Sequence, residues 1–375
     1  MDEMILENQN EIDLTYADNA AREDEYPVGK ISVERGFYTA FELKRKFDSE
    51  PKRVILDGDF QRDDVWNRNK RSELIESVLM GLPLPVFYFN QDKYGRLIVV
   101  DGRQRLTSLF RFMDGDFKLT NLKILKSLNG MKFSDLTAIQ QGRIEDFQIQ
   151  AHVIVPPTDE RIKFDIFDRV NRGGVQLNKQ EIRNALYQGK AIHFLNTIVS
   201  SSEFAEATGN AFVNERRMKD KYLISRVVSA LLYLGNKLED DEGNPYNYKG
   251  DIDDLQGRAM DYLNTLKDED IELLERGLKA ALKKSYELFG QDGFRMESTQ
   301  KKRTPINMNL FETIIIAILF CQESTSYERL KNDILHLKNT STFLDNIDNH
   351  RDGEIKFKWR IGIAQAIGRG EYNYA

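Results

Sequence analysis

The chain has 375 residues, of which 41% are hydrophobic, and its only cysteine is Cys321. A chain of this length can bury a large core and is long enough for about two domains. One cysteine excludes a disulfide framework and is typical of the reducing cytoplasm, where we expect the protein to reside. We expect no signal peptide, because the first residues are acidic. We expect no membrane span, because the apolar run at 311–321 is about half the length of a spanning helix.

Negative charge is concentrated at the start of the chain. The formal net charge is −6, but residues 1–25 carry nine carboxylates against one arginine, a charge of −8, which leaves +2 for residues 26–375. We predict that residues 1–29 form an acidic, flexible leader with little packing of its own. A second interpretation stays open, in which this leader shields a basic groove until a partner displaces it.

Short apolar strands alternate with helices in the first half of the chain. Strands are predicted at 54–56, 86–89 and 96–100 from their β-branched and aromatic residues. A helix is predicted over 69–80, where four aliphatic residues form one face before Gly81 closes it. A second helix is expected to begin near Arg103. These elements predict a mixed domain over residues 30–175.

The junction at residues 99–109 has the composition of an anion site. The strand ends in Asp101, and Gly102 lets the backbone bend sharply and approach a ligand closely. The start of a helix leaves N–H groups unpaired and carries partial positive charge, to which Arg103 and Arg105 add full charges. Phosphate is the natural ligand for such a turn. The alternative is that either arginine pairs with a surface carboxylate.

A later block, at 164–181, joins two predicted helices. Phe164, Phe167 and Val170 lie at helical spacing, and Gly173 with Gly174 ends this helix. Asn178, with Glu181 three residues later, is typical of a helix start. The glycine pair is either a plain turn or part of a ligand loop.

From Asn178 onward the apolar residues recur at three- and four-residue spacing. Helices are predicted at 181–186, 192–199, 222–234, 256–266, 270–289 and 309–321. A loop with three glycine and proline breaks interrupts them at 239–254. Residues 176–375 are therefore predicted to form a mainly α-helical domain, and the chain as a whole belongs to the α+β class.

Four ordered blocks resemble one known family. They are FQRDDVW at 60–66, MGLPLP at 80–85, VVDGRQRLTSL at 99–109 and IFDRVNRGGVQLNKQEIRNAL at 166–186. Together they resemble the N-terminal domain shared by GmrSD-type modification-dependent restriction enzymes and related phage-defence proteins. The resemblance spans roughly residues 30–190 and implies a ParB/sulfiredoxin-like fold. The family signature is DGQQR, and Arg103 here replaces its first glutamine, which adds a charge.

The resemblance implies that the signature loop binds, and in studied members hydrolyses, a nucleoside triphosphate. The nucleotide-binding residues that it implies are Gln61, Arg62, Gly102, Arg103, Arg105, Asn171 and Arg172, with Gly173 and Gly174 completing the last block. The implied catalytic residues are Asp101, Gln104 and Arg105.

The chemistry of these side chains agrees with those roles. Arg62 and Arg105 suit phosphate oxygens, which guanidinium groups bind bidentately. Asp101 would be repelled by phosphate, so it either holds a bridging Mg²⁺ or orients an attacking water. Gln104 is either a water-positioning or base-reading amide or an ordinary residue of the helix surface.

Other catalytic patterns are absent or weak. The sequence has no G-x-x-x-x-G-K-[ST] loop, its four histidines lack zinc-ligand spacing, and no His-Asn-His nuclease motif is recognisable. One pattern remains, in which Asp345 or Asp348 is followed by Glu354 and Lys356 on a strand predicted at 354–359. Two carboxylates and a lysine can hold Mg²⁺ for phosphodiester cleavage, although such triplets also arise by chance.

Two basic clusters in the second half have two interpretations. One contains Arg216, Arg217, Lys219 and Lys221, and the other contains Arg295, Lys301, Lys302 and Arg303. They either follow the phosphate backbone of DNA or form solvated faces.

Three hypotheses about function follow. In the first, the protein is a Mg²⁺-dependent nucleoside triphosphatase of a restriction or phage-defence system. In the second, it is a nucleotide-dependent switch or DNA-binding assembly module without turnover, which acts with a partner nuclease or as a homo-oligomer. In the third, the motif is kept for structure alone.

Overall fold

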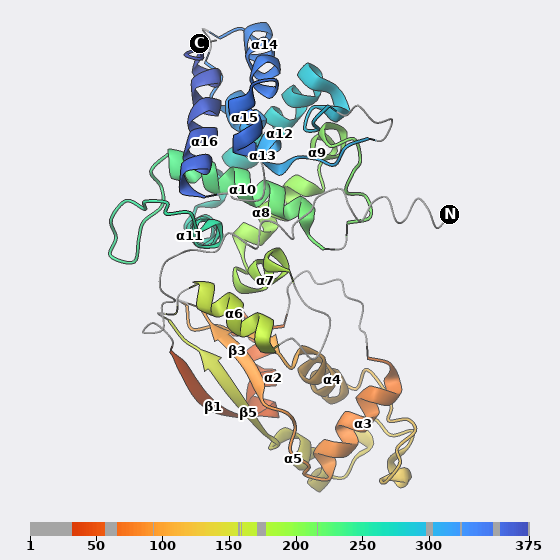
Figure 1. Cartoon of the computed structure of the whole chain (residues 1–375). Helices are drawn as coiled ribbons and strands as arrows, with labels where there is room; N and C mark the ends of the chain where they lie inside the picture. Colours follow the sequence, from red (N-terminus) through yellow and green to blue (C-terminus); the bar gives the residue numbers. More distant parts are fainter. Residues whose placement is uncertain are drawn as a thin grey trace. The chain divides into compact units, whose positions relative to one another are not determined.

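The computed structural model describes residues 32–56, 66–92, 94–156, 158, 160–170, 178–215, 217–297, 303–322, 325–347 and 353–373. They form two compact units (Figure 1). The N-terminal unit contains described residues 32–170 and 181–186, and the helical unit contains residues 178–180 and 187–373. The predicted acidic leader lies outside the described residues.

A five-stranded mixed sheet is the centre of the N-terminal unit. Its strands are β1 (Val33–Thr39), β2 (Val54–Ile55), β3 (Phe87–Gln91), β4 (Leu97–Asp101) and β5 (Gln148–Ile154), in the order β1-β5-β3-β4-β2. The β1–β5 and β3–β4 pairs are antiparallel, whereas β3–β5 and β2–β4 are parallel. Because β2 and β4 are parallel, the chain leaves both strands at the same end of the sheet.

Helices pack on the apolar face of this sheet. They are α2 (Ala40–Asp48), α3 (Arg68–Leu79), α4 (Arg103–Met113) and α5 (Ala138–Glu145), followed in the chain by α6 (Glu160–Val170) and α7 (Lys179–Leu186). Alternate strand residues such as Phe87, Phe89 and Val99 point into one core with Leu106 and Leu109 of α4. Each large apolar side chain buried in this way contributes roughly 1.5–3 kcal/mol, so the core fixes where β4 and α4 meet.

The mixed α+β class predicted from the sequence is confirmed. The strands predicted at 54–56, 86–89 and 96–100 correspond to β2, β3 and β4, and the helices predicted at 69–80 and from Arg103 correspond to α3 and α4. The ParB/sulfiredoxin-like topology stays a prediction.

The helical unit contains the remaining helices. They are α8 (Lys190–Val199), α9 (Ser202–Ala207), α10 (Lys219–Leu234), α11 (Ile252–Thr265), α12 (Asp268–Phe289), α13 (Met308–Leu319), α14 (Tyr327–Lys338), α15 (Ser341–Ile347) and α16 (Glu354–Arg369). Helix α13 is buried along nearly its whole length, which explains its apolar composition. No described helix has the length and apolarity needed to cross a lipid bilayer.

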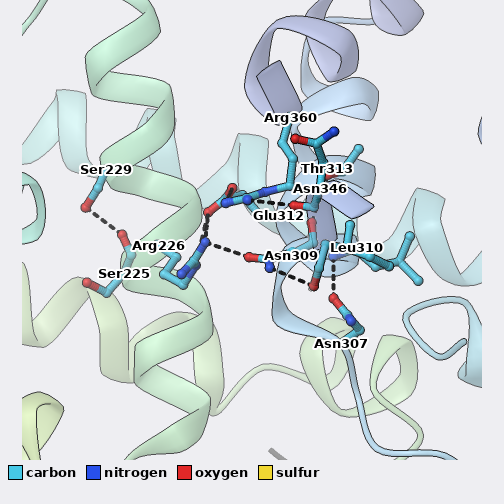
Figure 2. Close-up of polar contacts among 11 residues, drawn as sticks. Ser225, Arg226, Ser229, Asn307, Asn309, Leu310, Glu312, Thr313, Asn346 and Arg360 are labelled. Carbon is cyan, nitrogen blue, oxygen red and sulfur yellow. Dashed lines mark hydrogen bonds and ion pairs between the residues drawn. The ribbon is translucent and has the colours of Figure 1, made fainter. Parts of the chain in front are cut away.

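A buried ionic network connects three helices of this unit (Figure 2). Glu312 of α13 lies 3.0 Å from Arg226 of α10 and 3.5 Å from Arg360 of α16, and these side chains are at most 1% exposed. Asn309 accepts a hydrogen bond from Arg226 at 2.9 Å and donates one to the Ile347 carbonyl at 3.1 Å. Removing one member of such a network leaves buried charge uncompensated, typically at a cost of about 3–5 kcal/mol. The network therefore constrains the packing of α10, α13 and α16.

The strand predicted at 354–359 is wrong. Residues 354–369 form α16, in which Glu354 and Lys358 are one turn apart and form an ion pair at 2.7 Å. Lys356 donates to the backbone carbonyl of Asp345 at 2.6 Å, and Asp348 lies outside the described residues. Charged and apolar residues alternate at 354–359, which is typical of a strand. However, Phe357 and Ile361 are buried at four-residue spacing, so tertiary packing selects the helix.

Glu76 connects α3 to the segment that follows α4. Its side chain is 4% exposed and accepts backbone N–H bonds from Ile124 at 2.8 Å, Leu125 at 2.7 Å and Lys123 at 3.4 Å. Burial acts to raise the pKa of Glu76, but these N–H bonds outweigh it and the pKa is lowered. The carboxylate thus stabilises the folded state above its unfolded pKa of about 4.3, and this contribution is lost as the pH falls.

We expect Glu76→Gln to lower the free energy of unfolding of the N-terminal unit by about 1.5–3 kcal/mol at pH 7, because charge-assisted hydrogen bonds are lost. The difference from wild type should shrink as the pH falls towards 4. Urea denaturation followed by Trp66 fluorescence, in a Trp359→Phe background, measures this unit. The control is Glu73→Gln on the same helix, where the carboxylate is 65% exposed. If Glu76→Gln lowered the free energy of unfolding equally at pH 7 and pH 4, the role of the ionised Glu76 carboxylate would be contradicted.

Candidate functional site

The turn between β4 and α4 brings backbone and charge together. Gly102 has φ +99°, and a Cβ at this position would lie 2.1 Å from Cδ1 of Phe87. Only glycine fits both the left-handed backbone and this close approach. Because of this turn, α4 begins directly at Arg103, one residue after the strand ends.

The first turn of α4 is not capped by a side chain. Gly102 is the N-cap residue and can provide no side-chain acceptor, and the Leu106 N–H donates to the Gly102 carbonyl at 2.9 Å. No acidic residue occupies the first turn, which instead contains Arg103, Gln104 and Arg105. Positive side chains at the positive end of a helix are unfavourable unless an anion offsets them. The local structure thus favours binding of a negatively charged group.

Arg105 fixes the Asp101 carboxylate. The two side chains form an ion pair at 2.8 Å, and Asp101 is 39% exposed while Arg105 is only 11% exposed. The guanidinium also donates to the carbonyl oxygens of Pro85 and Val86, and it lies 4.1 Å from the centre of the Phe87 ring. Burial lowers the pKa of Arg105, and Asp101 opposes that shift. Arg105 therefore connects Asp101 and α4 to the segment entering β3.

The other residues of the loop face more open surroundings. Arg103 and Gln104 are half-exposed. Within the part of the chain that the structure describes, the Gln104 side chain makes no hydrogen bond. The predicted residues Asp101, Gly102, Arg103, Gln104 and Arg105 are thus gathered at one strand–helix junction, with the Asp101 carboxylate at its edge.

The remaining predicted site residues lie outside the described residues. Gln61 and Arg62 follow β2, which leaves the sheet at the same end as Asp101 because β2 and β4 are parallel. Asn171, Arg172 and the two glycines after them follow α6.

Phe87 is a residue that the sequence did not single out. Its ring lies against both Gly102 and Arg105, and it is 1% exposed. The alternation of β3 identifies Phe87 as a core residue, but only the pairing of β3 with β4 shows that it supports the loop.

A magnesium ion fits this site only with ligands from the substrate. Among the described residues there is no group of three or more histidine, cysteine, aspartate or glutamate side chains able to hold a metal. One Asp101 oxygen accepts from Arg105, and the half-exposed carboxylate keeps its second oxygen for another ligand. Mg²⁺ is commonly bound by one or two carboxylates together with substrate phosphates and water, which agrees with a single aspartate here.

The fold and the loop together define a mixed-sheet domain with a glycine-containing strand–helix turn that carries two arginines and an aspartate. Residues 42–188 match the model of the GmrSD restriction endonuclease N-terminal domain, so this segment of the chain is similar to that family. The matched segment includes the 101–105 loop and the predicted blocks at 61–62 and 171–174. None of the curated proteins or solved structures compared with the chain matches it. The matched family is described as a domain of a restriction endonuclease.

We expect Gly102→Ala to destabilise the N-terminal unit by about 3 kcal/mol, because the new methyl group would collide with Phe87 and strain the backbone. Thermal unfolding measured by Trp66 fluorescence in the Trp359→Phe background checks this. Gly115→Ala serves as control: its φ is also positive, at +76°, but nothing lies within 4 Å of an added Cβ. Equal losses in the two variants would show that contact with Phe87 is not important.

Proposed function

We propose that the loop formed by residues 101–105 binds the phosphates of a nucleoside triphosphate and, with Mg²⁺, hydrolyses it, as part of a restriction or phage-defence system that acts on DNA. The observation that carries this proposal is the uncapped, wholly non-acidic first turn of α4, held against the sheet by Gly102. Backbone N–H groups and arginine at a helix start bind phosphate oxygens well.

We propose a different role for each side chain of the loop. Arg103, half-exposed at the first position of α4, is our candidate for the phosphate clamp. Arg105 uses most of its N–H donors in hydrogen bonds to Asp101 and to backbone carbonyl oxygens. We therefore propose that Arg105 holds Asp101 in position. Asp101 then orients the attacking water or holds Mg²⁺, which would neutralise developing charge on the phosphates. Gln104, half-exposed in the first turn of α4, is our candidate for orienting the same water.

A second candidate function has its own support. The Arg105 guanidinium lies 2.8 Å from one Asp101 oxygen and leaves only part of the carboxylate for an attacking water, which favours a nucleotide-dependent switch without turnover. In this case a partner nuclease would cut the DNA. Because residues 354–358 are helical and their Glu354–Lys358 pair is internal, we no longer propose a Mg²⁺-dependent nuclease site there.

We expect the protein with Mg²⁺ to release phosphate from at least one of ATP, GTP, CTP and UTP. Asp101→Asn should abolish release while nucleotide binding, measured by calorimetry, persists, because the carboxylate does not contact the phosphates directly and the proposed phosphate contacts come from Arg103 and the backbone. Binding by the wild type without release would support the switch. If none of the four nucleotides binds, both proposals fail.

Arg103→Gln should weaken nucleotide binding about tenfold or more, because a charge-assisted contact to phosphate is worth roughly 1.5–3 kcal/mol. The matched control is Arg111→Gln in the last turn of α4, where Arg111 pairs with Asp116 at 3.2 Å. If the Arg103→Gln and Arg111→Gln variants bound the nucleotide with equal affinity, Arg103 would not be a phosphate-binding residue.

A further inference from the structure

A cleft in the helical unit is separate from the 101–105 loop. It lies between the end of α12 and α14 and has a volume of about 470 Å³. Small-molecule sites commonly measure roughly 300–1,000 Å³. Phe289, Met296 and Leu335 contribute apolar wall to the cleft, and Leu335 is 40% exposed. The size and the walls suit a compact ligand with an apolar part.

The charged side chains of the cleft are mostly cationic. Among the described residues, the cleft is lined by the four cations Arg295, Arg303, Lys331 and Lys338 and by the two carboxylates Asp292 and Glu297, which gives a surplus of two positive charges. Asp292 is shared, because its Oδ1 lies 3.3 Å from Arg295 Nε and 2.7 Å from Arg303 Nε.

The two lysines on α14 carry most of this surplus. Lys331 is half-buried and makes no hydrogen bond or ion pair within the described part of the chain. Lys338 donates to the backbone carbonyl of Arg295 at 3.0 Å, and no described carboxylate lies within ion-pair distance of it. Burial lowers the pKa of Lys338, and Glu297 opposes the shift only in part. A partly desolvated ammonium group whose burial is offset only in part by a nearby carboxylate favours a bound anion.

We propose that this cleft binds a small organic phosphate, with its phosphoryl group between Lys331 and Lys338 and its apolar part against Leu335 and Phe289. Two features favour a small ligand over a nucleic-acid backbone. Both carboxylates border the cleft and would repel a continuous polyanion, and the cations gather in one hollow instead of following a long surface. The proposal is independent of the nucleotide site at residues 101–105.

Calorimetry on the full chain in an Arg103→Gln background, with AMP and inorganic pyrophosphate as separate probes, tests the cleft. We expect saturable binding of both probes, weakened about tenfold by Lys331→Gln and further by Lys331→Gln combined with Lys338→Gln. Lys331→Glu should abolish it. The matched control is Lys283→Gln, which removes an exposed lysine of α12 outside the cleft and should leave the affinity unchanged.

Several outcomes would overturn the proposal. One is the absence of saturable binding of either probe, and another is equal affinity of Lys331→Gln and Lys283→Gln for the probes. A third is that the lysine replacements weaken binding of a 20-base-pair DNA duplex but not of AMP or pyrophosphate, which would make the cleft a nucleic-acid surface. Because Lys331 makes no hydrogen bond or ion pair with the residues that the structure describes, its single replacements should keep the wild-type thermal midpoint. They remain informative even if the Lys338 variant unfolds.

Discussion

The contact between Gly102 and Phe87 is the constraint on which the candidate site depends. A side chain at position 102 would overlap the ring, and φ there is +99°. The strand can therefore turn into α4 within one residue, which places a helix start, two arginines and an aspartate at one point. Any longer connection would separate the Asp101 carboxylate from the N–H groups of the first turn. The core beneath the sheet thus determines the geometry of the loop above it.

Arg105 shows how stability and function compete for one side chain. Its guanidinium neutralises Asp101, satisfies the carbonyl oxygens before β3 and lies on Phe87, all within a nearly buried environment. A residue used in this way holds its neighbours in place and has few donors left for a ligand. In the function that we propose, phosphate recognition by the described residues would therefore rest on Arg103 and the backbone, and Arg105 would set the position of the carboxylate. The hypothesis that the motif is purely structural is strongest at Arg105 and weakest at Arg103.

The helical unit handles its charge in two different ways. In its core, Arg226 and Arg360 converge on Glu312 and on amide and carbonyl oxygens, so one positive charge is balanced by a carboxylate and both guanidinium groups donate hydrogen bonds within the protein. In the cleft between α12 and α14, Lys331 and Lys338 have no carboxylate partner among the described residues. Compensated buried charge constrains helix packing, whereas uncompensated charge at a concave surface attracts ligands. The same unit therefore combines a rigid interior with a surface suited to anions.

Local patterns in the sequence determined the strands β2, β3 and β4, the helices α3 and α4, the glycine turn and the mainly helical second half, because side-chain periodicity and a left-handed turn are properties of short segments. The family resemblance also followed from contiguous blocks.

Tertiary structure decided the rest. Residues 354–358 alternate like a strand, but burial of Phe357 and Ile361 makes them helical. The partners of Arg105 come from the segment before β3, twenty residues earlier, and the cleft joins residues of α12 to those of α14. Such contacts depend on how distant elements pack, which no local periodicity encodes.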